Sequence, residues 1–170
     1  MKTALVLGGT NAHIPLIENL KKRGFYTVLI DYHENPIARK TADLHLRESA
    51  MDTKAVLHIA IERQAELVIS TCSDQLNAIA CYVAEKLGLP APYSYQTALN
   101  VTHKFFMKEK MHKKGIPTAK YICVRSENEL ENHGLNLPVV IKPVDGCGSK
   151  GVRKAHHPDE LKSYVKEALN

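Results

Sequence analysis

Residues 4–30 of the sequence read ALVLGGTNAHIPLIENLKKRGFYTVLI, and the spacing of the apolar residues changes twice within this stretch. Ala4 to Leu7 is a continuous apolar run that ends at two glycines, which is typical of a strand buried on both faces. A helical spacing then continues to Gly24, and Tyr26 to Ile30 read as a second strand. The stretch therefore predicts a strand, a helix and another strand.

The same alternation continues over the next sixty residues. Asp52 is expected to cap a helix, Leu67 to Ser70 to form a third buried strand, and Asp74 to Leu87 to form a helix that ends at Gly88. Strands that alternate with helices favour an α/β fold with an open parallel sheet and right-handed crossovers. Ligands of such sheets bind at the carboxyl ends of the strands.

The composition limits the class of protein. The 170 residues are 44% hydrophobic and 24% charged, which excludes disordered and low-complexity chains. A net charge of +5 suits an anionic ligand such as a nucleotide without requiring nucleic acid. No apolar run approaches about 18 residues, so we expect no membrane span, no signal peptide and a cytoplasmic location. The cysteines and histidines match no metal-ligand spacing, so we assign no metal to this chain.

Two prolines in the segment from Leu89 to Pro92 interrupt both patterns. We place a boundary near residue 97, which gives two domains, residues 1–97 and 98–170. The elements expected in the second domain are a basic helix at Val101–Lys114, strands at Ala119–Val124, Pro138–Lys142 and Val152–Ala155, a short helix at Glu127–His133 and a final helix from Pro158.

Residues 137–152 read LPVVIKPVDGCGSKGV and are the most informative stretch for chemistry. An apolar strand delivers Lys142 to a loop with glycines at 146, 148 and 151, and such a loop can turn its backbone amides toward one anion. Lys142 and Lys150 would add positive charge for a phosphate. A plain glycine-rich hairpin with Lys142 in solvent explains the pattern equally well. The stretch is not a Walker A loop, because Ser149 precedes Lys150 and a strand follows.

A second basic stretch, HKFFMKEKMHKKGIPTAKY, covers residues 103–121. Lys104 and Lys108 are four residues apart and so share one helical face, where one of them can reach a nucleotide. A solvated basic face on an amphipathic helix is the alternative.

Together these two stretches resemble the small nucleotide-covering subdomain of ATP-grasp enzymes. The order is a helix with Lys104, the turn from Gly115 to Ala119, a strand that ends at Lys142–Pro143, and the loop from Gly146 to Gly151. Residues 1 to about 97 resemble the Rossmann-like pre-ATP-grasp domain of the carbamoyl-phosphate synthase large-subunit and biotin-carboxylase branch. The resemblance covers the whole chain.

The resemblance implies roles for named residues. Lys104 and Lys142 correspond to the two lysines that contact the ATP phosphates, and Lys142 also to a contact with the adenine side. Gly146, Gly148, Ser149, Lys150 and Gly151 correspond to the lid over the phosphates. Members of the family phosphorylate a carboxylate or bicarbonate, and an amine, ammonia or another nucleophile attacks the acyl phosphate. The acceptor would lie in the crevice lined by Gly8, Gly9, Thr10, Asn11, Ser73 and Asp74, although Asp74 can equally cap its helix.

Two departures from the family pattern affect these expectations. His103 stands where many relatives have an acidic residue before the first lysine. The family's Mg²⁺ ligands lie in a large carboxyl-terminal subdomain, so we expect Mg²⁺ to bind through residues beyond 170 and the 170 residues alone to be an inactive fragment. A surface left by that subdomain could produce a homodimer of the fragment.

Two other functions fit parts of the sequence. Gly8-Gly9 after a strand, with Asp31 at the end of the next strand, partly matches a dinucleotide-binding pattern, but residues 8–13 lack the Gly-x-Gly-x-x-Gly spacing of an NAD site. A nucleotide-sensing or interaction module that keeps the fold without the chemistry is the other alternative.

Overall fold

The computed structural model describes residues 2–131, 133–146 and 148–169. It divides into two compact units, Met1–Thr102 and His103–Asn170, which are described separately below. The division falls five residues beyond the boundary expected near residue 97. The helix α4 (Tyr95–Thr102) accounts for the difference, because its buried Ala98 packs with Ala78 and Cys81 of the first unit.

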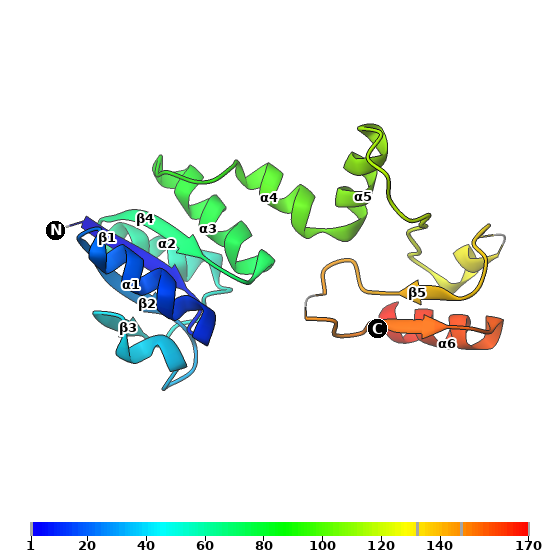
Figure 1. The fold of residues 1–170 in the computed structure, drawn as a ribbon, viewed down its shortest axis with the longest axis horizontal. Coiled ribbons are helices and arrows are strands. Elements are labelled where there is room, and N and C mark those ends of the chain that lie inside the picture. The colour runs from blue at the N-terminus through cyan, green and yellow to red at the C-terminus, as the bar shows by residue number, and fades with distance from the viewer. Residues whose placement is uncertain (1, 132, 147, 170) are drawn as a thin grey trace. The chain divides into compact units, whose positions relative to one another are not determined.

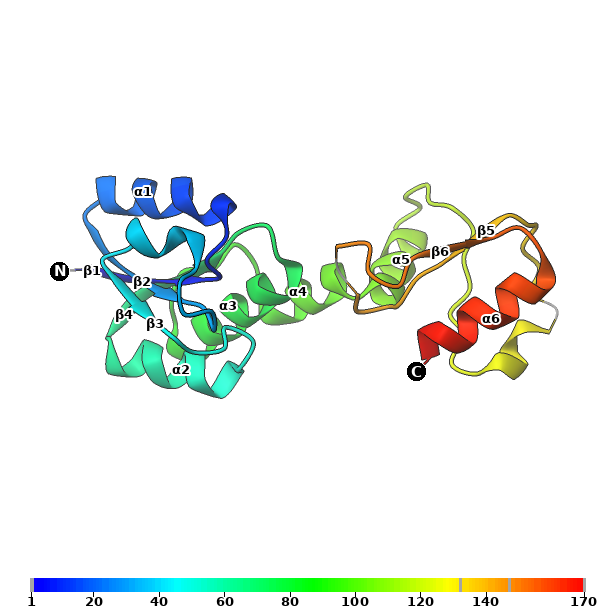
Figure 2. The same cartoon turned by 90° about the horizontal axis from the view of Figure 1, so that it is seen from below.

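The first unit is built on a parallel sheet (Figures 1 and 2). Its four strands are β1 (Lys2–Leu7), β2 (Phe25–Ile30), β3 (Leu44–Leu46) and β4 (Ala65–Ser70). They lie in the order β3-β2-β1-β4, and every pairing is parallel. The parallel α/β sheet expected from the sequence is therefore confirmed. From β1 the chain first adds β2 and β3 on one side and then adds β4 on the other side, so the strand order reverses between β1 and β4.

Helices cover both faces of this sheet (Figure 2). The α-helices are α1 (Ile14–Lys22), α2 (Thr53–Glu62) and α3 (Asp74–Leu87), and the short 3-10 helices are η1 (Asn11–His13) and η2 (Ile37–Lys40). Buried residues of α1 pack with Ala4, Val6 and Leu29 on one face. Those of α2 and α3 pack with Leu5, Leu7 and other strand residues on the opposite face. Consecutive residues of β1 therefore feed two different cores, as an all-apolar strand requires.

The first turn of α2 gives a test of the local structure. Asp52 is the N-cap, and its Oδ1 accepts hydrogen bonds from the amides of Lys54 at 3.0 Å and Ala55 at 3.1 Å. We expect Asp52→Ala to lower the free energy of unfolding by about 1 kcal/mol, because two amides lose their acceptor. Urea unfolding followed by circular dichroism measures this. Asp52→Asn should retain most of the stability, and equal losses in both variants would exclude the capping role.

The second unit is a small antiparallel hairpin with helices around it. Its elements are α5 (Lys104–Lys113), η3 (Glu127–Leu130), β5 (Val139–Ile141), β6 (Arg153–Ala155) and α6 (Pro158–Leu169). β5 pairs with β6 in antiparallel register, with Val139 opposite Ala155. Leu130, Ala155, Leu161 and Val165 form a buried cluster between the hairpin and α6.

Two expectations for the second unit are wrong. The helix expected at Val101–Lys114 is split at His103, whose ψ of 113° is extended, and the amide of Lys104 donates to the Val144 carbonyl at 3.0 Å. The strand expected at Ala119–Val124 belongs to no sheet of the described residues. This segment is held to α5 by side chains instead, as described below. Nowhere in residues 2–131, 133–146 and 148–169 does a helix have the length and apolar character needed to cross a membrane.

Candidate functional site

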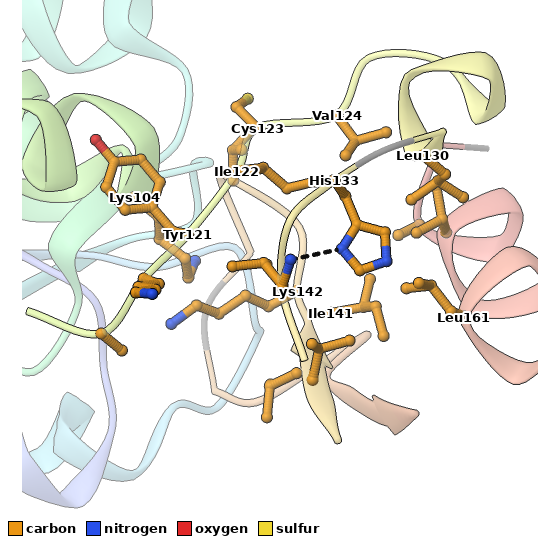
Figure 3. Close-up of a pocket in the computed structure, with 18 of the residues that line it drawn as sticks. Lys104, Tyr121, Ile122, Cys123, Val124, Leu130, His133, Ile141, Lys142 and Leu161 are labelled. Atoms are coloured by element: carbon orange, nitrogen blue, oxygen red, sulfur yellow. Dashed lines mark hydrogen bonds between the residues drawn. The ribbon is translucent and has the colours of Figure 1, made fainter. Parts of the chain in front are cut away.

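The second unit contains a cavity of about 650 Å³ (Figure 3). Its walls come from α5, the segment 119–124, Leu130 with residues 133–136, the strand β5 with its flanks, and one side of α6. Lys104, Lys108, Lys120 and Lys142 line it, and no acidic residue is among the described lining residues. The cavity is thus an apolar space with a cationic border, and its volume lies within the usual range for small-molecule sites.

Lys104 enters this cavity from the first position of α5. Its amide is bonded to the Val144 carbonyl, and its Nζ donates to the Gly146 carbonyl. Both contacts join the start of α5 to the segment that follows β5. Residues 42 positions apart in the sequence therefore form one side of the site.

Lys142 reaches the same cavity from the end of β5 (Figure 3). The strand holds Val139 and Ile141 partly buried against the hydrophobic cluster, while Lys142 is exposed. Among residues 2–131, 133–146 and 148–169, no group forms a hydrogen bond or ion pair with its ammonium group. An unpaired ammonium beside an apolar cavity is available to an anionic ligand.

The glycine-rich loop joins β5 to β6 and is packed on Pro143. A Cβ atom on Gly151 would lie 2.9 Å from Pro143 Cγ, and one on Gly146 would lie 3.3 Å from Pro143 Cβ. Gly148 and Ser149 have positive φ values of 61° and 60°. Gly146 thus touches Lys104, whereas Gly148, Ser149, Lys150 and Gly151 do not line the cavity. The loop is a hairpin connection, as the plainer interpretation requires, and Cys147 lies outside the described residues.

A network on α5 shapes the cavity wall and was not identified from the sequence. Lys108 Nζ donates to Thr118 Oγ1 and lies 5.7 Å from the centre of the Tyr121 ring. The Tyr121 hydroxyl donates to Glu109 Oε1 at 2.7 Å, and this bond raises the pKa of Tyr121. These contacts hold the segment 118–121 on the helix. The four-residue spacing of Lys104 and Lys108 was the available signal, but it does not show that Lys104 pairs with the Gly146 carbonyl and Lys108 with Thr118.

The expected acceptor crevice lies in the first unit, where the strand order reverses between β1 and β4. Gly8, Gly9, Thr10 and Asn11 follow β1, and Ser73 and Asp74 stand at the start of α3 after β4. Ser73 is the N-cap of α3, and its Oγ accepts the Leu76 amide at 3.4 Å. Thr10, Asn11 and Asp74 are exposed, whereas Gly8 and Gly9 are buried.

The backbone amides of this turn are occupied within the protein. Gly8 donates to the Ile30 carbonyl at 2.9 Å and Gly9 to Asp31 Oδ2 at 2.8 Å. The Thr10 amide donates to His13 Nδ1 at 3.2 Å. Three successive amides therefore have internal acceptors, so binding of an anion by this backbone would require rearrangement of the turn.

Asp31 is likewise engaged within the fold. Its Oδ2 accepts the Gly9 amide, and its Oδ1 accepts the His33 amide at 2.9 Å. His33 Nδ1 lies 2.8 Å from the same oxygen. A Cβ atom on Gly9 would lie only 2.4 Å from Pro36 Cβ, so Pro36 covers the turn. This geometry disfavours a dinucleotide site, which needs a free carboxylate and an open glycine turn.

The thiols and the metal-ligating residues add no further site. Cys72, Cys81 and Cys123 are free. No group of three or more His, Cys, Asp or Glu side chains in the part of the chain that the structure describes is arranged to hold a metal ion. These described residues do not form a Mg²⁺ site by themselves.

No protein-family model matches the chain. The chain is 34% identical over 89 residues to the alpha-aminoadipate–LysW ligase LysX of Saccharolobus solfataricus, a match that covers 51% of this chain and 32% of that protein. It is 27% identical to the phosphoribosylamine–glycine ligase of Thermococcus gammatolerans over 99% of this chain and 40% of that protein. The chain thus spans well under half of the length of these relatives.

Solved structures show the same fold. The crystal structure of the N5-carboxyaminoimidazole synthetase from Staphylococcus aureus, complexed with ADP, superposes with a TM-score of 0.78. The sequence identity is 19%, and the match covers 97% of this chain and 44% of that one. These relatives are ATP-grasp ligases, and the match lies in their amino-terminal portion. The chain is therefore similar to the amino-terminal portion of ATP-grasp ligases.

Proposed function

We propose that this chain carries the nucleotide-covering part of an ATP-dependent ligase that activates a carboxylate or bicarbonate for attack by an amine or ammonia. One observation carries the proposal: Lys104 and Lys142, the two lysines of the family pattern, line one cavity although they come from different elements. A solvated basic helix beside an unrelated hairpin would not require this. The ADP in the S. aureus structure and the ligase names of the relatives support the same function.

In this proposal the cavity residues position the nucleotide. Lys142, whose ammonium group has no described partner, contacts the phosphates from β5, and Lys104 contacts them from α5. The apolar walls, including Ile122 and Ile141, hold the adenine out of water. The loop of Gly146, Gly148, Ser149, Lys150 and Gly151 covers the phosphates.

The reaction then follows from charge placement. A carboxylate oxygen attacks the γ-phosphorus, the bond to the β,γ-bridging oxygen breaks, and ADP leaves with that electron pair. An amine next attacks the acyl carbon and releases phosphate. The lysines offset the negative charge of the phosphates, and the covering loop keeps water from the acyl phosphate. A carbamoyl-phosphate synthase-like reaction is the case in which bicarbonate and ammonia are used and the carbamate that they form is then phosphorylated by a second ATP.

The acceptor side belongs to the first unit. We assign the acceptor substrate to the carboxyl ends of β1 and β4, where the strand order reverses. The residues at these strand ends are Thr10, Asn11, Ser73 and Asp74. Gly8 and Gly9 act there through the shape of the turn, because their amides have internal acceptors. Alpha-aminoadipate and glycine occur in the names of the two relatives, so an amino acid is the substrate class to test first.

Nucleotide titration tests the proposal. Isothermal titration of the complete protein with a non-hydrolysable ATP analogue should give binding that Lys104→Ala weakens at least tenfold, because a charge-assisted contact is lost. Lys110→Ala, on the same helix but exposed and outside the cavity, is the control. NADH binding, or analogue binding unchanged in Lys104→Ala, would contradict the proposal.

A nucleotide-binding module without chemistry is the second candidate. The complete protein incubated with ATP and a mixture of amino acids separates the two candidates. Release of ADP that depends on the amino acids supports the ligase, whereas tight ATP binding without ADP release supports the module.

A further inference from the structure

The turn after β1 contains a buried histidine in an unusual position. His13, the last residue of η1, is 2% exposed. Its Nδ1 lies 3.2 Å from the Thr10 amide nitrogen and 2.9 Å from Thr10 Oγ1, and its own amide donates to the Thr10 carbonyl at 3.0 Å. This is a capping box in which histidine occupies the place that Glu or Gln usually fills.

The hydrogen bonds identify the protonation state of the ring. The Thr10 amide can only donate, so Nδ1 must accept and carries no proton. A neutral imidazole then has its proton on Nε2. Nε2 is buried and makes no hydrogen bond of ordinary geometry with the described residues, although the Leu7 carbonyl lies close enough to the ring to affect its pKa. A proton added to Nδ1 would set one N–H donor against another and remove the acceptor that the Thr10 amide has among the described residues. The new N–H would then donate to Thr10 Oγ1.

The imidazole ring also packs against Gly8 in the glycine turn. A Cβ atom on Gly8 would lie 2.9 Å from His13 Nε2 and 3.0 Å from Leu76 Cδ1, so the imidazole and the first turn of α3 enclose Gly8. The Gly9 carbonyl accepts the Ala38 amide at 3.0 Å on the other side. Movement of the ring would therefore shift the whole turn from Gly8 to Thr10.

We propose that His13 is a positioning residue that holds the turn Gly8–Thr10 in its observed shape through its unprotonated Nδ1, so that the acceptor side of the ligase is formed only while this ring is neutral. The assignment of this turn to the acceptor substrate rests on the proposed function, whereas the hydrogen bond and its dependence on pH do not. A Glu or Gln at this place would hold the turn at every neutral or mildly acidic pH. Histidine makes the same contact conditional on pH.

The charged groups around His13 define the direction of the effect. Burial lowers the pKa of His13 below its ordinary value of 6.5, against smaller raising effects of the Leu7 and Thr10 carbonyls and of Asp31. Asp31 itself faces His33 and the Gly9 amide. From η2, Arg39 turns to Glu34 and Asn35, while Lys40 is exposed, as is Asp74 at the start of α3.

Burial is therefore the dominant influence on the pKa of His13. Between the lowered pKa and 6.5, the unfolded chain binds more protons than the folded protein. The free energy of unfolding therefore rises with pH across that window and falls as the solution becomes more acidic.

Amide hydrogen exchange of the 170-residue chain, measured by NMR between pH 5 and pH 8, tests the inference. The protection factor of the Thr10 amide should fall at least tenfold toward pH 5, while that of the core residue Leu5 changes much less. In His13→Gln, whose carbonyl accepts at every pH, Thr10 should stay protected throughout. In His13→Leu, Thr10 should be unprotected throughout. His58→Gln, which alters an exposed histidine of α2, should behave as the wild type.

Two results would overturn the inference: Thr10 protection that does not change with pH in the wild type, or His13→Gln that loses protection in parallel with the wild type. If His13→Leu does not fold, the wild type and His13→Gln still decide. The same pair should differ in urea unfolding, where the fall in midpoint toward pH 5 is smaller for His13→Gln. Because no ligand is used, a negative result here leaves the nucleotide titration unaffected, and the converse holds too.

Discussion

Replacing Lys142 with alanine is expected to weaken nucleotide binding by the complete protein by about 1.5–3 kcal/mol, which is roughly 10- to 150-fold in Kd. The reason is specific to this lysine. Its ammonium group has no partner among the described residues, so the substitution breaks no bond inside the protein and removes only a contact with the ligand. Isothermal titration with a non-hydrolysable ATP analogue measures the loss directly.

Two further variants make this prediction selective. Lys162→Ala removes the same charge from an exposed position of α6 that does not line the cavity, so Kd should stay within about twofold of the wild type. Lys142→Arg keeps the charge and should retain part of the affinity. Equal losses in Lys142→Ala and Lys162→Ala would mean that only net charge matters, and Lys142 would then have no place in the site.

Gly9→Ala is expected to lower the free energy of unfolding of the first unit by about 3 kcal/mol, because overpacking at a closed site forces the backbone to move. The added Cβ would lie 2.4 Å from Pro36 Cβ and 3.0 Å from Asp31 Oδ2. The Gly9 amide and carbonyl are both bonded, to Asp31 and Ala38, so the backbone has little freedom to yield. Urea unfolding followed by far-UV circular dichroism provides the measurement.

Gly24→Ala is the matched control, since an added Cβ there meets nothing within 4 Å and only the φ of 80° opposes it, at a cost of about 1 kcal/mol. Pro36→Gly removes the atom that Gly9→Ala would meet. The double variant Gly9→Ala/Pro36→Gly should therefore be more stable than the sum of the two single losses by at least about 1 kcal/mol. Strict additivity would show that Pro36 is not what closes the turn.

The first unit could be predicted from the sequence because its signals are local. The apolar run from Ala4 to Leu7, the cap at Asp52 and the helix Asp74–Leu87 with its end at Gly88 each depend on neighbouring residues, and the structure confirms them. The three-residue strand β3 was missed because its sequence, Leu-His-Leu, is too short to show a period.

The second unit was predicted less well because its structure depends on contacts between distant residues. A helix through Val101 and Lys114 satisfies the local pattern, yet the Val144 carbonyl takes the amide of Lys104 and makes a new helix begin there. Ala119 to Val124 has the composition of a strand, but a strand needs a partner strand, and the described residues offer none. The segment is held instead by side chains of α5 and by Val124, which packs on the hydrophobic cluster.

In the candidate site, too, some features could be predicted from the sequence and others depend on contacts between distant residues. The family resemblance implies that Lys104 and Lys142 contact ATP, and this stays a prediction, whereas the structure shows that both lysines line one cavity. The internal partners of the glycine turn could not be inferred. Nothing in the sequence indicates that Asp31 and His13 accept the amides of Gly9 and Thr10, because those bonds depend on side-chain orientation in the folded chain.

A crystal structure of the complete protein with a non-hydrolysable ATP analogue tests the central claim most directly. The account predicts that the triphosphate lies within hydrogen-bonding distance of Lys142 Nζ and Lys104 Nζ, with the adenine between Ile122 and Ile141. A triphosphate bound elsewhere, with both lysines in contact only with water, would contradict it.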